Sequence, residues 1–214
     1  MTSGKAVLDP VERVSEVVFG VLMALTFTGS VSVATGGGEI RTLLYAAFGC
    51  NIAWGLADAA MYLIGTLTER GRAYTLMRRL HAAAHPDQAH SLIAEALPEG
   101  VRQVVGAGEL EAMRRRLAEL PQPPARARLR RDDYVAAAGI FALVVLATFP
   151  VALPFVVFSD PAVAIRTSNA AALATLFLGG WSLGRHAGTR PWRSGVLMAG
   201  VGAVLVVVIV ALGG

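Results

Sequence analysis

The sequence has few cysteines and few charges. Cys50 is the single cysteine among 214 residues, so the chain can form no internal disulfide and no cysteine-based zinc cluster. Charged residues make up 16% of the chain and hydrophobic residues 55%. Soluble domains usually contain roughly 25% charged residues. The composition is therefore atypical of a soluble globular protein and points to a membrane protein.

Motifs for nucleotide chemistry and for covalent catalysis are also missing. The glycine run "GGGE" at 36–39 has no following lysine of the kind that a phosphate-binding loop needs. No serine–histidine–aspartate pattern stands out. The pI of 9.8 is not accompanied by any nucleic-acid-binding motif. We therefore expect neither an enzyme, nor an ATP-driven pump, nor a nucleic-acid-binding protein, and no permanently bound cofactor.

Five long apolar runs dominate what remains. Each is long enough to cross about 30 Å of hydrocarbon as an α-helix, which satisfies its own backbone hydrogen bonds in lipid. The sequence thus predicts an all-α polytopic membrane protein with five transmembrane helices and a helical cytoplasmic insert between the second and the third. The predicted spans are 17–34, 42–65, 134–158, 161–184 and 195–213.

Basic residues are distributed unevenly around these spans. If the N-terminus is cytoplasmic, all of the 19 Lys and Arg residues except Arg41 and Arg166 lie on the cytoplasmic side. The positive-inside rule then places the C-terminus outside. The basic face should attract anionic lipid. A composition rich in Ala, Val, Gly and Arg, with the single lysine Lys5, is typical of GC-rich bacteria, so the expected location is a bacterial inner membrane.

Charge also divides the chain into three regions. Residues 1–69 are predicted to form an amphipathic lead-in and the first two spans, 70–131 the cytoplasmic helical insert, and 132–214 the last three spans. Within the insert, a helix is expected to restart at Pro86, and "GELEAMRRRLAEL" predicts another amphipathic helix. Pro150 and Pro154 predict a kink in the third span.

Asp58 is the only carboxylate well inside a predicted span. A charge at the bilayer centre costs roughly 2.5–3.5 kcal/mol on insertion scales, and this cost is tolerated where the group faces an aqueous path or a cation. Asn51 and Asp58 are seven residues apart and share one helical face. Glu12 and Glu16, one turn apart, lie where the first span enters the membrane. Because the first two spans are antiparallel, Glu16 and Asp58 are expected to line one acidic entrance.

The side chains around this entrance predict a metal site. Carboxylate oxygens of Glu16 and Asp58 suit a divalent cation, and the thioethers of Met23 and Met61 suit a transition metal. Glu12, Glu16 and Asp58 are also candidate proton-coupling groups, since a carboxyl group in low dielectric can exchange a proton for a cation. Structural roles remain as alternatives. Asp58 could pair with a basic residue or form a hydrogen bond, the glutamates could be solvated interfacial charges, and the methionines could face lipid or pack.

Three histidines in the insert are weaker candidates for metal binding. His81 and His85 are four residues apart, a spacing that can place two imidazoles on one metal ion, and His90 follows. No HExxH motif occurs, and a solvated helical surface is the alternative explanation.

Four segments share a pattern with a known family. These are "RPWRSGVLMAGVGA" (190–203), "ATFPVALPFVV" (147–157), "GLADAAMYL" (55–63) and, more weakly, "SEVVFGVLMAL" (15–25). Together with five spans and an insert after the second, they resemble the vacuolar iron transporter family.

The resemblance implies a homodimeric, proton-coupled exporter of Fe²⁺ or Mn²⁺ from the cytoplasm. It implies that Asp58 and Glu16 take the positions of the acids of the second and first spans, and that the insert corresponds to a metal-collecting domain. The chain departs from the family pattern in having Glu16 in place of an aspartate, Thr66 in place of a methionine, and an arginine-rich insert. A proton or cation channel that uses the same acids, and a non-transporting membrane adaptor or regulatory protein, are alternative functions.

Overall fold

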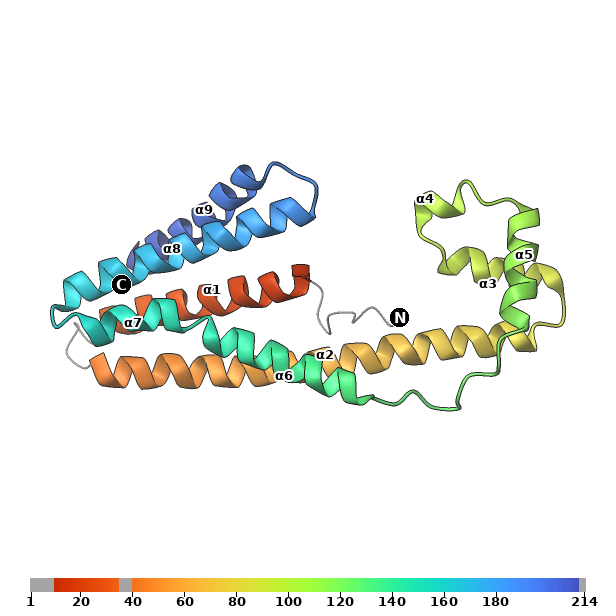
Figure 1. The fold of residues 1–214 in the computed structure, drawn as a ribbon, viewed down its shortest axis with the longest axis horizontal. Coiled ribbons are helices and arrows are strands. Elements are labelled where there is room, and N and C mark those ends of the chain that lie inside the picture. The colour runs from red at the N-terminus through yellow and green to blue at the C-terminus, as the bar shows by residue number, and fades with distance from the viewer. Residues whose placement is uncertain (1–9, 35–39, 212–214) are drawn as a thin grey trace, which may run out of the picture. The chain divides into compact units, whose positions relative to one another are not determined.

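The computed structural model describes residues 10–34 and 40–211, and the described residues form helices and connecting loops without any strand (Figure 1). This confirms the predicted all-α class. The helices are α1 (Pro10–Ala34), α2 (Ile40–Ala82), α3 (Pro86–Ala96), α4 (Glu99–Arg102), α5 (Ala107–Ala118), α6 (Arg131–Leu146), α7 (Phe149–Val157), α8 (Pro161–His186) and α9 (Pro191–Ala211).

Four helical stretches among the described residues are long and apolar enough to cross a membrane. They are Leu44–Ala82, Arg131–Val157, Ala162–His186 and Pro191–Ile209. Each overlaps one of the last four predicted spans, and the first continues well past the predicted end at residue 65. The chain is therefore built as a multi-pass membrane protein. The remaining predicted span, 17–34, falls within α1 and stays a prediction.

The third predicted span is divided into two helices, α6 and α7. The amide of Thr148 donates to the Val145 carbonyl at 3.1 Å, which is a tighter turn than the α-helix allows. The Thr148 carbonyl then accepts from the amides of Val151 and Ala152, at 3.1 and 2.9 Å, and starts α7. Pro150 has no amide hydrogen, so the regular bond to the carbonyl four residues earlier is missing. The predicted kink is thus an interruption between two helices.

The chain divides into two compact units. One unit, called the bundle unit below, comprises Met1–Tyr62 and Arg131–Gly214, and the other, called the insert unit, comprises Leu63–Arg130. The division falls inside α2, so this single helix contributes its first part to the bundle unit and its second part to the insert unit.

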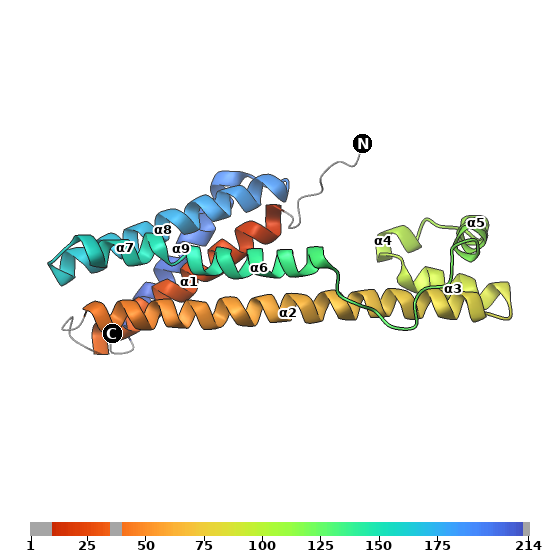
Figure 2. The same ribbon diagram turned by 60° about the horizontal axis from the view of Figure 1, so that its bottom comes forward.

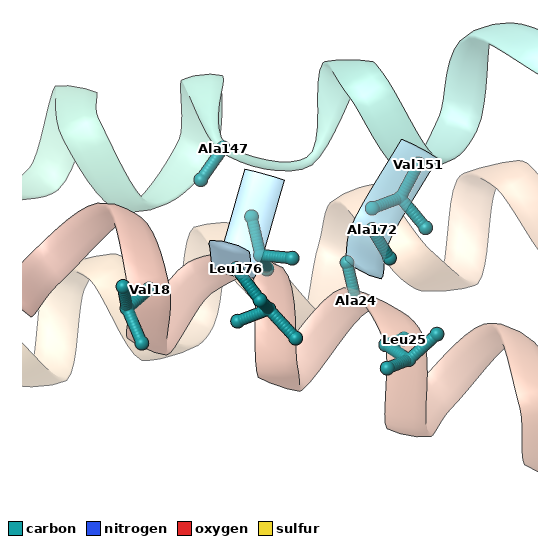
Figure 3. Packing of buried hydrophobic residues seen from close by; sticks show 8 residues of the cluster. Val18, Ala24, Leu25, Ala147, Val151, Ala172 and Leu176 are labelled. Atoms are coloured by element: carbon teal, nitrogen blue, oxygen red, sulfur yellow. The ribbon is translucent and has the colours of Figure 1, made fainter. Parts of the chain in front are cut away.

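The core of the bundle unit is made of small and medium-sized side chains. In Figure 2, α1 runs beside α6, α7 and α8. Figure 3 shows buried side chains of these helices lying close together. Ala and Val predominate because the helix backbones approach each other closely, which is typical of membrane helices. The buried cluster consists of Val18, Val21, Ala24, Leu25, Ala147, Val151, Ala172 and Leu176.

Glycines at two helix contacts show how close that approach is. A Cβ atom added at Gly20 of α1 would lie 2.8 Å from the carbonyl oxygen of Val144 in α6. One added at Gly180 of α8 would lie 2.5 Å from the carbonyl oxygen of Ser194 in α9. Both contacts are with backbone, so no side-chain rotation relieves them, and only glycine fits.

α8 begins at a cap that the sequence prediction missed. The side chain of Asp160 accepts hydrogen bonds from the amides of Ala162 and Val163, at 2.8 and 3.4 Å, and Pro161 occupies the first helical position. Further along α8, the buried Ser168 hydroxyl donates to the Val151 carbonyl of α7 at 2.7 Å. This bond joins the two helices in the core of the bundle unit.

The insert unit contains the end of α2, the helices α3 to α5 and an extended segment. α3 and α5 begin where the sequence predicted helices, whereas the short α4 was not predicted. The buried side chains of α3 are Ala89 and Ile93. Residues 121–130, called the strap below, follow α5 and are held to α2 by two arginines. Arg70 donates to the Arg128 carbonyl, and Arg78 donates to the carbonyls of Pro124 and Ala125 at 3.2 and 2.8 Å.

Candidate functional site

Asn51 joins three parts of the bundle unit through a buried side chain. Its relative exposure is 0%. The Nδ2 group donates to the Gly20 carbonyl of α1 at 3.2 Å and to the Thr148 hydroxyl, between α6 and α7, at 2.5 Å. The Oδ1 atom is shielded and has no hydrogen-bond partner. The side chain of Asn51 therefore has one amide oxygen that can still accept a hydrogen bond or contact a cation.

Asp58 lies on the same face of α2, about 10 Å along the helix axis from Asn51. Its side chain is half-buried, and its Oδ2 atom is shielded without a hydrogen-bond partner. An unpartnered carboxylate oxygen in a protein interior is costly, because the lost hydration is not replaced. Asp58 is thus a second acceptor with unused capacity on this face.

α1 brings two further carboxylates toward this region. Glu16 is half-buried and lies within electrostatic range of both Asp58 and Glu12. The mutual repulsion of carboxylates acts on Glu16 and is weakened when any one of the three binds a proton or a cation. Glu16 is thus linked electrostatically to Glu12 and to Asp58, although the three carboxylates do not form a compact cluster, and we call these three residues the acidic group.

Aromatic contacts hold α2 in register around Asn51. Phe19 of α1 and Trp54 of α2 meet edge to face with ring centroids 6.0 Å apart. Phe48 of α2 and Phe149 of α7 meet in the same way at 5.4 Å. These pairs come from the helices that Asn51 joins. The polar face of α2 therefore belongs to a helix that is fixed by packing, as a precise binding site requires.

The two candidate methionines have different surroundings. Met23 on α1 is half-buried, whereas Met61 on α2 is 66% exposed. The next residue, Tyr62, packs against the buried pair Ala136 and Ile140 of α6. The side of α2 that carries Tyr62 therefore faces α6. The Met61 thioether is accordingly available at the surface of the bundle unit.

The three histidines of the insert unit have separate surroundings. Both ring nitrogens of His81 are shielded and without a partner, and His85 is exposed at the residue that precedes α3. The Nε2 atom of His90 lies 3.0 Å from a carboxylate oxygen of Glu111. In the described ranges, no three His, Cys, Asp or Glu side chains are grouped as metal ligands.

Glu111 is the centre of a charged network on α5. Its carboxylate accepts from Arg114 at 2.7 and 2.8 Å and from Arg115 at 2.9 Å, besides the contact with His90. These donors, Arg114 first, hold the pKa of Glu111 well below its usual range. The same pairing raises the pKa of Arg114. His90 is therefore part of a charged network on the surface of the insert unit.

Sequence reasoning missed the partners of Asn51. Thr148 is one of several hydroxyl residues in or near the apolar runs, and the Gly20 contact is made by a backbone carbonyl that has no sequence signature. A usable signal was present at Thr148, because Pro150 follows two residues later. A proline inside a membrane helix frees backbone groups that nearby polar side chains tend to satisfy.

No protein-family model and no curated protein matches the chain. The chemistry of the site is that of its own residues. Carboxylates of the acidic group and the amide oxygen of Asn51 offer oxygen ligands of the kind that protons and hard or borderline cations bind.

Proposed function

We propose that the protein is a proton-coupled transporter that moves a divalent transition-metal ion, Fe²⁺ or Mn²⁺, out of the cytoplasm. The metal is the transported cargo, and no resident cofactor or enzymatic reaction is involved. Glu16 and Asp58 bind the metal and protons alternately, and Glu12 takes part in the proton exchange. Met23 and Met61 are candidate softer ligands.

The acidic group is the observation that carries this proposal. Asp58 has a shielded, unpartnered oxygen on an apolar helix, and Glu16 lies within electrostatic range of it. Two nearby carboxylates in a low-dielectric medium are costly when both are ionised. A divalent cation relieves that cost without protons, and protons relieve it without the cation. The same residues can therefore exchange one for the other.

The interruption between α6 and α7 supports an ion path beyond the acidic group. Interrupted membrane helices in secondary transporters expose backbone carbonyls and helix ends to the ion. Here Thr148 lies at the interruption and bonds to Asn51, whose Oδ1 is unpartnered. This oxygen lies two helical turns from Asp58 and would be the next ligand on the same face of α2.

The proposal includes the topology that the sequence predicts. α1 is the first of five spans, the N-terminus and residues 70–131 are cytoplasmic, and the C-terminus lies outside a bacterial inner membrane. We further propose a homodimer, in line with the resemblance to the vacuolar iron transporter family. Exposed apolar side chains of α2, among them Tyr45 and Leu56, offer surface to lipid or to a second copy. Anionic lipid is the expected partner of the cytoplasmic face.

The test is metal flux into proteoliposomes that contain a fluorophore quenched by Fe²⁺ or Mn²⁺, with and without a pH gradient. Wild-type protein is compared with Asp58→Asn, which removes the charge at constant size. Glu69→Gln is the matched control, because it removes an exposed carboxylate from the same helix. We expect quenching that depends on the gradient and is lost in Asp58→Asn but retained in Glu69→Gln.

The alternative functions predict different results. A channel would give a conductance that needs no pH gradient and still depends on Asp58. An adaptor or regulatory protein would give no flux above empty liposomes, and Asp58→Asn would alter only assembly or stability. Absence of flux from folded wild-type protein would refute the transport proposal for these ions.

A further inference from the structure

A cleft of about 630 Å³ opens in the insert unit between α2, α3 and the strap. α2 lines it with a stripe of polar side chains on one face, Thr68, Arg72, Thr75 and Arg79. Their spacing of four, three and four residues keeps them on the same side of the helix. Gly71 borders the cleft, and a Cβ added there would meet nothing within 4 Å, so the space beside it is open.

Two arginines of this stripe have unused hydrogen-bonding capacity. Arg70 and Arg78 hold the strap through its carbonyls. Arg72 and Arg79, by contrast, are exposed and make no hydrogen bond or ion pair within the described part of the chain. Each presents five N–H donors in a planar fork. The threonine hydroxyls in the stripe donate to carbonyls of α2 itself, Thr68 to Ile64 and Thr75 to Gly71.

A second cavity, of about 470 Å³, adjoins the first on the side of the strap. Tyr74 and Ala125 line both cavities. Arginines of the strap extend the positive lining, and Glu95 of α3 is the one carboxylate among the residues that line the two cavities. The strap arginines in the second cavity are Arg126, Arg128 and Arg130.

We propose that this arginine-lined cleft binds a phosphate or phosphoryl group, with Arg72 and Arg79 as its principal ligands. Arginine forks match the paired oxygens of such a group, and bonds between two charged partners are stronger than neutral ones. A hydrophobic ligand is disfavoured, because desolvating these guanidinium groups would not be repaid. The proposal concerns a site separate from the acidic group and does not depend on transport.

The position of the cleft along α2 allows two sources of this group. Arg72 follows the end of the predicted span at residue 65 by seven residues, or about 10 Å along the helix. This is just beyond a headgroup layer about 5–7 Å thick, which its long side chain can reach. Arg79 lies about another 10 Å further along the helix, within reach of a soluble phosphate compound. The shared chemistry is the phosphoryl group, and the two sources can be separated by the choice of probe.

Binding is measured by titration calorimetry on the full chain, delipidated in an uncharged detergent. The probes are inorganic pyrophosphate and a water-soluble short-chain phosphatidic acid. Arg72→Gln and Arg79→Gln are each expected to weaken binding about tenfold or more, because each removes charged hydrogen bonds. Arg116→Gln on α5, an exposed arginine with the same charge change, is the matched control and should leave affinity within about twofold of wild type.

Glu95→Gln provides a test of opposite sign. It removes the one carboxylate of the lining and should tighten binding severalfold. Because the substitution is conservative and exposed, a folded variant is expected. Binding of phosphatidic acid alone would assign the site to a lipid headgroup, and binding of pyrophosphate as well would assign it to soluble phosphates. No binding of either probe, or equal losses in Arg72→Gln and Arg116→Gln, would overturn the proposal.

Discussion

Different interactions stabilise the interior of each of the two units of this protein. In the bundle unit, Ala, Val and Gly let helices approach until backbone meets backbone, as at Gly20 and Gly180. Its buried polar side chains are few and bond across helices, as Asn51 and Ser168 do. In the insert unit, arginine donors hold the strap to α2 and surround Glu111. Close packing dominates one unit and charged hydrogen bonds the other.

This difference has a physical reason in each unit. Lipid is as apolar as a leucine side chain, so membrane helices gain little from burying apolar area and associate through tight packing and a few hydrogen bonds. A short segment cannot bury a large core, as the small buried set Ala89 and Ile93 of α3 illustrates. In the insert unit, arginine guanidinium groups bond to carbonyls of the strap and to Glu111.

The largest predicted loss of unfolding free energy that distinguishes the two units is at a glycine contact of the bundle unit. In Gly180→Ala, the new Cβ would lie 2.5 Å from the Ser194 carbonyl, so α8 and α9 must move apart. Overpacking of this kind costs about 1–3 kcal/mol. Gly200→Ala is the control, since a Cβ there meets nothing within 4 Å. Unfolding in mixed micelles measures both, and equal losses would contradict close backbone packing as the basis of the bundle unit.

The next effect concerns the bond between Asn51 and Thr148. Asn51→Ala, Thr148→Val and the double variant form a cycle whose coupling free energy isolates this pair. Hydrogen bonds between membrane helices are worth about 0.6 kcal/mol on average and about 1.7 at most, and a buried bond between α2 and the α6–α7 interruption should fall in this range. Additive losses in the same unfolding assay would mean that the two side chains contribute independently.

In the insert unit, Arg78→Ala should release the strap while leaving the bundle unit intact. Two carbonyl acceptors lose their donor, and because the arginine is exposed the change in unfolding free energy should be at most about 1.5 kcal/mol. Hydrogen exchange followed by mass spectrometry should show faster exchange at 121–130. Arg79→Ala, which makes no bond to the strap, should leave exchange there unchanged, and a similar increase in both variants would show that Arg78 is not a specific clamp.

The smallest effect is an acid sensitivity centred on Glu111. Its pKa is held below the usual 4.5 in the folded chain by Arg114, Arg115 and His90. A lowered folded-state pKa contributes stability that is complete above the unfolded-state pKa and is lost as pH falls through the folded-state pKa. Hydrogen exchange of α3 and α5 should therefore accelerate in wild type as pH is lowered below about 4.5, after correction for intrinsic rates. Glu111→Gln should exchange faster at neutral pH and show a weaker acid response, and an unchanged acid response would assign it to other groups.

Much of the fold could be predicted because local features of the sequence, namely apolar runs and prolines, determine it. Long apolar runs predict membrane helices, and four helices long and apolar enough to cross a membrane overlap the predicted spans. Pro86 marks the start of α3, and Pro150 marks the interruption in the third span, whereas Pro154 lies inside α7. Even the missed cap at Asp160 has a local signal, because an aspartate directly precedes Pro161.

The candidate site was predictable only in part. The sequence by itself determined that Asn51 and Asp58 share a face of α2, since helical periodicity fixes this without any partner. Tertiary structure alone decided that Asn51 bonds to the Gly20 carbonyl and to Thr148, while its Oδ1 and one oxygen of Asp58 remain unpartnered. Such contacts depend on how closely the helix backbones approach, and that distance is set by the combined packing of several helices rather than by any one segment.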